Sequence, residues 1–118
     1  MFNTNYSIEV FYKTTLISKI WVNNNNVTFE NYGNVLPVFL PFGIKTSATI
    51  EDLEEFYEFR CFPRERANCK QILKGLGVDC YEPELICRKT HGLQFDDFVW
   101  LQFSDEPQVC WNDIKLRD

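Results

Sequence analysis

The sequence contains few of the residues on which common catalytic motifs depend. It has five glycines and one histidine among 118 residues. It contains no G-x-x-x-x-G-K-[ST] phosphate loop, no G-x-G-x-x-G fingerprint and no G-x-S-x-G nucleophile elbow. It also lacks H-E-x-x-H, and a lone histidine cannot supply a two-histidine metal site. We therefore expect a protein that is not an enzyme and that binds no cofactor or metal.

Long apolar runs are missing as well. The longest, Val38–Phe42, is interrupted by Pro41, whereas a membrane-spanning helix needs about 20 apolar residues. Residues 1–5 lack the basic and apolar regions of a secretory signal peptide. These absences predict a cytoplasmic protein with no membrane association.

The cysteines do not form a recognisable framework. There are five of them, and no two form a C-x-x-C pair. A secreted disulfide scaffold normally has an even number, and a zinc site needs closely spaced ligands. We expect free thiols, most of them buried as small apolar side chains. A cysteine nucleophile with His91 as its base is the alternative, but nothing in the sequence favours it.

The composition favours one packed domain over residues 1–118. Hydrophobic residues make up 45% of the chain and aromatic residues 16%, which is enough for a core, whereas two halves would each be too small. Alternating apolar residues predict strands over 6–12, 15–22 and 27–32. Pro37 and Pro41 restrict the apolar segment 35–42 to an edge strand or an extended stretch.

Helical patterns follow the strands. Thr49 and Asp52 have the spacing of a capping box, and Pro63 ends the helix that they begin. We expect further helices over 64–76 and 83–90, a strand over 98–103 and a short strand at 110–111. The order of strands, helices and strand predicts an α+β fold: a small, largely antiparallel sheet packed with two or three short helices.

Charge is unevenly distributed along the chain. The net charge is −5 and the isoelectric point is about 4.9, which disfavours direct binding of nucleic acid. An acidic block (Glu51, Asp52, Glu54, Glu55, Glu58) precedes a basic one (Arg60, Arg64, Arg66, Lys70, Lys74). The loop between the two predicted helices combines an aromatic residue with arginines, as interface hot spots do. The candidate partner-binding residues are Arg60, Phe62, Arg64, Glu65, Arg66 and Lys70.

Simpler interpretations exist for each of these residues. Phe62 could belong to the core while the arginines pair with Glu51–Glu58, and the basic side chains could form an ordinary solvated helix face. His91 fits a helix end, where a cation is favoured. Asp96 and Asp97 fit a turn before a strand, although two carboxylates could also bind a metal.

Several segments resemble, in order, the small N-terminal subdomain of HipA-like toxin kinases. They comprise an apolar Leu-Pro segment, an aromatic helix ended by a proline loop, a second helix, a glycine-containing turn with an aromatic strand, and a final Trp-Asn-Asp-Ile. In this chain they are Leu36–Pro41, Leu53–Arg66, Ile72–Gly77, Thr90–Leu101 and Trp111–Ile114. The resemblance covers residues 35–114, about two-thirds of the chain.

The resemblance implies a regulatory protein rather than a kinase. HipA-like kinases carry their ATP-binding and catalytic residues in a larger domain, and no kinase motif occurs in this sequence. In some three-gene toxin–antitoxin systems, a separate protein similar to this subdomain binds the toxin kinase and neutralises it. We therefore expect a HipA-like serine/threonine kinase as partner. The alternative is a mobile-element-encoded acidic inhibitor of a host defence nuclease.

Overall fold

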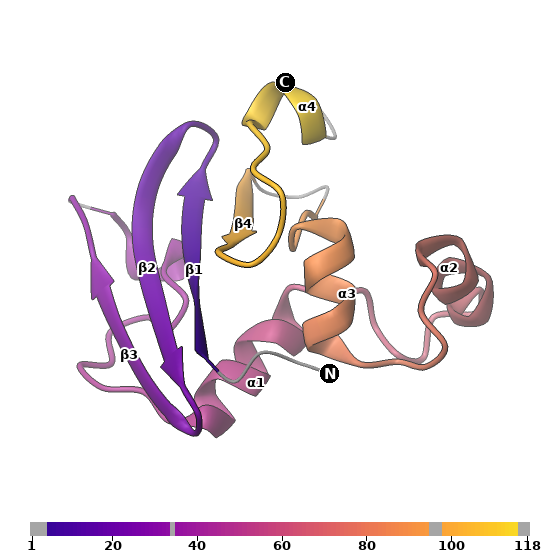
Figure 1. The fold of residues 1–118 in the computed structure, drawn as a ribbon, viewed down its shortest axis with the longest axis horizontal. Helices are drawn as coiled ribbons and strands as arrows, with labels where there is room; N and C mark the ends of the chain where they lie inside the picture. Colours follow the sequence, from indigo (N-terminus) through magenta and orange to yellow (C-terminus); the bar gives the residue numbers. More distant parts are fainter. Residues whose placement is uncertain (1–4, 34, 95–97, 116–118) are drawn as a thin grey trace.

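The computed structural model describes residues 5–33, 35–94 and 98–115. Four antiparallel strands form one sheet in the order β3-β2-β1-β4, and the main helices lie beyond β4 and behind the sheet (Figure 1). The strands are β1 (Asn5–Tyr12), β2 (Thr15–Asn23), β3 (Asn26–Asn31) and β4 (Val99–Phe103). The helices are η1 (Pro37–Phe39), α1 (Ile50–Phe59), α2 (Cys69–Leu76), α3 (Pro83–Thr90) and α4 (Trp111–Ile114). The expected α+β fold with an antiparallel sheet is confirmed.

The first three strands form a meander whose turns suit their residues. Lys13 and Asn24 adopt left-handed backbone angles, with φ of 53° and 56°, in the short connections that the sequence indicated. The register between β1 and β2 shifts between Val10 and Phe11, which pair with Ser18 and Leu16. The residue left over, Ile17, is therefore a bulge in β2, where two successive residues, Ile17 and Ser18, are both buried.

The core lies between one face of the sheet and helices α1 and α3. Every residue of β4 is buried, and Ile8, Val10 and Ile20 contribute fully buried side chains from β1 and β2. Buried residues of α1 (Leu53, Phe56, Tyr57) and of α3 (Ile86, Cys87) belong to the same cluster. The N-terminal hairpin and the C-terminal strand therefore depend on each other for burial.

Most helix ends follow the local signals. Thr49 and Asp52 form the expected reciprocal capping box at the start of α1. Helix α2 ends at Gly77 with a left-handed φ of 76°, a conformation that glycine adopts without strain. Helix α3 has the expected bounds, and His91 follows it as its left-handed cap.

Three expectations about secondary structure are wrong. Segment 35–42 is neither an edge strand nor extended throughout: it forms η1 and turns, because its two prolines lack the N–H that a ladder needs. Helix α2 begins at Cys69 rather than Arg64, since the apolar spacing that packs it starts there. Residues 111–114 form helix α4 rather than a strand, with Asp113 bonding the backbone N–H of Cys110.

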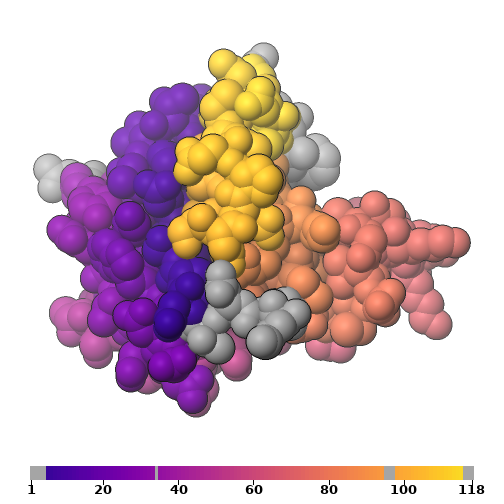
Figure 2. Space-filling view, in the orientation of Figure 1, coloured from indigo at the N-terminus to yellow at the C-terminus, as the bar shows by residue number. Residues whose placement is uncertain are grey.

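Helix α2 is the part of the described structure farthest from the sheet (Figure 1). It contacts α3, and its buried residue is Leu73. The space-filling view shows the segment that carries α2 as a lobe projecting from the rest of the molecule (Figure 2). The basic residues of this segment are therefore presented away from the core.

Candidate functional site

Arg60 is not on the surface where the sequence analysis expected it. Its relative exposure is 3%. The Nε atom donates to the carbonyl oxygen of Gly92 at 2.8 Å, and Nη2 donates to that of Val99 at 2.9 Å. The guanidinium thus connects the end of α1 to the turn after α3, through Gly92, and to the start of β4, through Val99. Its role is structural, because a buried arginine needs such partners.

The rest of the predicted contact region forms a small aromatic cluster. Phe62 is half-buried and meets the ring of Tyr81 edge-on, with 5.6 Å between centroids. The Tyr81 hydroxyl donates to the carbonyl oxygen of Phe62 at 2.6 Å. The Arg64 guanidinium lies over the ring of Tyr81, 4.5 Å from its centroid. The structure therefore brings Phe62 and Arg64 together through a residue that sequence reasoning had not singled out.

The other predicted contact residues point outward. Glu65, Arg66 and Lys70 are exposed. Within the described residues, neither Arg64 nor Arg66 forms an ion pair with the acidic block of α1. The simpler interpretation in which the arginines pair with Glu51–Glu58 is therefore not what this structure shows, while Phe62 is partly core.

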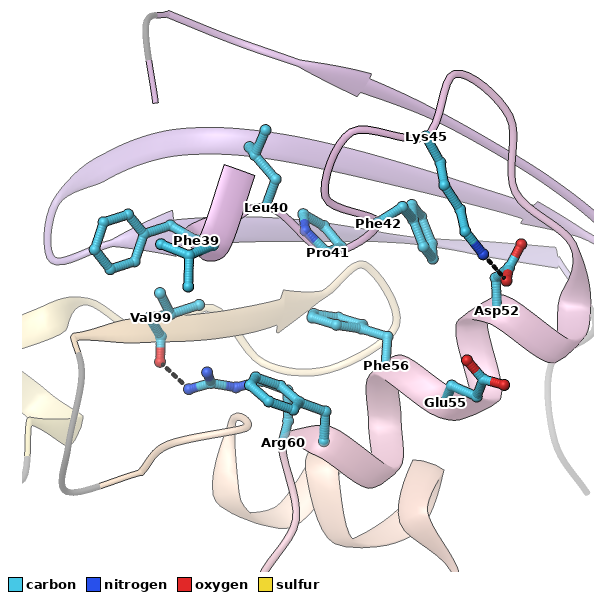
Figure 3. A pocket seen from close by; sticks show the side chains of 12 residues that line it. Phe39, Leu40, Pro41, Phe42, Lys45, Asp52, Glu55, Phe56, Arg60 and Val99 are labelled. Atoms are coloured by element: carbon cyan, nitrogen blue, oxygen red, sulfur yellow. Dashed lines mark hydrogen bonds and ion pairs between the residues drawn. The ribbon is translucent and has the colours of Figure 1, made fainter. Parts of the chain in front are cut away.

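A groove that sequence reasoning missed lies between segment 38–45 and α1. Its volume is about 370 Å³, and Figure 3 shows its lining from both elements. One wall carries Phe39, Leu40, Pro41 and Phe42 in succession, and Phe56 and Val99 face them (Figure 3). The Lys45–Asp52 ion pair lies at one end and buried Arg60 at the other.

The rim of this groove is unusually apolar. The large hydrophobic side chains that are exposed in the described structure are Leu36, Val38, Ile44 and Phe59, at 65%, 75%, 86% and 66%. Val38 and Phe59 line the groove from opposite walls. Ile44 lies in segment 38–45 and Leu36 two residues before it, although neither lines the groove itself. Phe42 and Phe56 form the floor of the groove. This floor is well packed, because Phe42 is buried with its ring centroid 4.8 Å from that of Phe29 and 6.2 Å from that of Phe56.

One charge at the groove is neutralised and another is not. The Lys45 ammonium donates to the Asp52 carboxylate, and this bond, together with the backbone N–H of Thr49, lowers the pKa of Asp52. Glu55 lines the groove, is exposed, and makes no ion pair within the described ranges. The groove therefore combines an apolar surface with one exposed carboxylate, Glu55, on its α1 wall.

The sequence contains a signal for one wall of this groove, the wall formed by α1. Leu53, Phe56 and Tyr57 fall on the buried face of α1, whereas Phe59 falls off that face by helical spacing. A large aromatic outside the apolar stripe of a helix indicates an exposed contact residue. Segment 38–45 gives no such signal, because the apolar residues and prolines of 35–42 fit an edge strand or an extended stretch equally well.

The candidate base of the sequence, His91, and two of the candidate nucleophiles, the cysteines, make contacts within the fold. The His91 Nδ1 atom lies 3.2 Å from the carbonyl oxygen of Leu101, and its own carbonyl accepts from the Leu101 N–H at 2.8 Å. Cys61 and Cys87 are buried with sulfurs 3.8 Å apart. The hydrogen bond with Cys61 and burial raise the pKa of the Cys87 thiol, which disfavours a thiolate.

Two further expectations can be placed. Cys80 and Cys110 are exposed, so the expectation that most thiols are buried fails for them. Asp96 and Asp97 lie outside the described residues. Within the residues that the structure describes, no cluster of histidine, cysteine, aspartate or glutamate could hold a metal ion.

Comparisons with known proteins leave the relationships of this chain open. No family model, curated protein or solved structure matches it. None of the helices in the described part of the chain has the length and apolar character needed to cross a bilayer.

Proposed function

We propose that this chain is a non-catalytic protein-binding module that binds a HipA-like serine/threonine kinase and neutralises it. The observation that carries the proposal is that two of the exposed large apolar side chains, Val38 and Phe59, line opposite walls of one groove, while the other two, Leu36 and Ile44, lie close in sequence to the wall that carries Val38. Scattered exposed apolar residues are ordinary, but a contiguous patch beside a groove is typical of a protein contact site.

The kinase as partner rests on the sequence resemblance. Two of the segments that carry it, Leu36–Pro41 and Leu53–Arg66, supply the two walls of the groove. Three of the four exposed large apolar residues, Leu36, Val38 and Phe59, thus lie in segments that resemble the kinase subdomain. This coincidence supports a contact that involves the resembling segments rather than an unrelated face.

The loop from Phe62 to Lys70 is proposed as a secondary contact. Its exposed charges, Glu65, Arg66 and Lys70, suit the polar rim of an interface. Its aromatic residue is already engaged with Tyr81, so it offers little additional apolar area.

The proposal is tested by measuring binding and inhibition with a purified HipA-like kinase from the same genome. Titration calorimetry is expected to show a one-to-one complex, and autophosphorylation of the kinase should fall in proportion to complex formation. A kinase that neither binds the chain at micromolar concentrations nor loses activity in its presence would refute the proposal.

One observation favours a second candidate function, inhibition of a host defence nuclease. Four acidic side chains of α1 (Glu51, Glu54, Glu55, Glu58) are exposed together and could imitate phosphate charges. Binding to such a nuclease that is lost when these four are changed to lysine, but is unaffected by changes at Val38 and Phe59, would support this second function over the first.

A further inference from the structure

Helix α1 separates two hollows of different character. The apolar groove, lined by Glu55 and Phe59, lies along one side. On the other side is a second hollow of about 250 Å³ with an acidic lining. Its lining residues include Tyr6, Tyr57, Glu54, Glu58, Glu82 and Glu84. A segment bound across α1 would therefore meet apolar surface first and carboxylates next.

The acidic residues of α1 extend beyond what the helix itself can use. Glu51 and Asp52 lie in the first turn, where the helix dipole favours negative charge. Glu58 lies near the opposite end, where the dipole disfavours it, and the last turn has no basic residue. Glu54 and Glu58 are also four residues apart, a spacing at which like charges repel.

These carboxylates lack a direct ion-pair partner within the described structure. Glu51, Glu54, Glu55 and Glu58 form no ion pair among the residues described, and the nearby Lys45 is engaged by Asp52. Of the basic side chains that follow along the chain, Arg60 is buried, Arg64 lies over Tyr81, and the exposed Arg66 and Lys70 form no ion pair with these carboxylates within the described residues. Because like charges four residues apart destabilise a helix, a cation bound beside Glu54 and Glu58 would stabilise α1.

We propose that the groove binds an apolar segment of the protein partner that carries lysine or arginine beside its apolar side chains. This inference rests on the proposed protein-binding function and specifies its chemistry. The apolar side chains of the segment lie between Val38 and Phe59, over the floor formed by Phe56. Its basic side chains cross α1 and meet Glu54 and Glu58. Burial between the walls provides affinity, and the carboxylates determine orientation and accelerate association.

The first experiment maps the occupant directly. The photoreactive residue p-benzoylphenylalanine replaces Phe59 in one variant and exposed Arg66 in a control, and each is irradiated with the catalytically inactivated HipA-like kinase. The Phe59 position is expected to give a kinase peptide with apolar residues flanked by lysine or arginine, identified by mass spectrometry. A crosslinked peptide that is acidic, or that comes from a second copy of this chain, would overturn the inference.

The second experiment tests the charges without removing the apolar contacts. The double variant Glu54→Gln and Glu58→Gln keeps side-chain size, and Glu65→Gln serves as the matched control in the loop. We expect the double variant to bind the kinase about tenfold more weakly at low salt, with a difference that shrinks as salt screens the charges. Unchanged affinity in the double variant would overturn the inference while leaving kinase binding intact. If the unaltered chain does not bind the kinase at all, the proposed function itself fails and the inference fails with it.

Discussion

The groove beside α1 and the loop from Phe62 to Lys70 are both exposed, but they differ in what a partner would gain. The groove leaves Val38 and Phe59 in water above a buried floor. In the loop, Phe62 and Arg64 already pack on Tyr81. Because affinity comes mainly from apolar surface that is still available for burial, the groove offers more of it. The arginine-rich composition that singled out the loop is partly explained by packing within the chain.

Arg60 lies between the two regions, and its replacement should have the largest effect on stability. Changing Arg60 to Met removes the hydrogen bonds that its guanidinium donates to the carbonyl oxygens of Gly92 and Val99. Because losing hydrogen bonds from a buried charged group is destabilising, we expect a loss of about 2–4 kcal/mol in the free energy of unfolding, measured by urea denaturation. The exposed Arg66→Met is the control. Equal effects of the two changes would contradict the structural role of Arg60.

Helix α1, which forms one wall of the groove, can be destabilised at its N-terminal cap. Thr49 accepts a hydrogen bond from the Asp52 N–H at 3.2 Å, and the Asp52 carboxylate accepts from the Thr49 N–H at 3.0 Å. Thr49→Ala should therefore reduce the free energy of unfolding by about 1 kcal/mol. The exposed Thr46→Ala is a suitable control, with little expected change. Equal urea midpoints for the two variants would contradict the cap.

The loop side should respond less. Arg64→Gln removes the guanidinium from the ring of Tyr81, which corresponds to about 0.5–1 kcal/mol of stability for such a contact at an exposed site. Arg66→Gln is the control, because no aromatic ring within the described residues lies under Arg66. If Arg66→Gln were the more destabilising of the two, the aromatic cluster would not be the contact that orders this loop.

A pH-dependent effect should distinguish the ion pair at the groove end. The bonds from Lys45 and from the Thr49 N–H lower the pKa of Asp52. A depressed carboxyl pKa stabilises the fold above the unfolded value of about 3.9 and stops doing so as pH falls through the folded value. Urea denaturation should therefore show Asp52→Asn less stable than the unaltered chain near neutral pH, with the difference shrinking below about pH 4. A difference that stays constant into acid would contradict this origin.

Local signals in the sequence predict local structure well. The capping box at Thr49 and the bounds of α3 depend on neighbouring residues, and the structure confirms them. The groove could not be predicted in this way, because it joins segment 38–45 to α1 through packing between side chains such as Phe42 and Phe56. The burial of Arg60 could not be predicted for the same reason, since its hydrogen-bond acceptors lie on residues 32 and 39 positions later.

Calorimetric titration of the HipA-like kinase with two matched double variants tests the central claim most directly. Val38→Asp with Phe59→Asp alters the groove, and Arg64→Glu with Arg66→Glu alters the loop, in variants whose fold is checked by circular dichroism. We expect the groove variant to weaken the dissociation constant by about 100-fold or more and the loop variant by less than about tenfold. The reverse order would contradict the account and place the main contact in the loop.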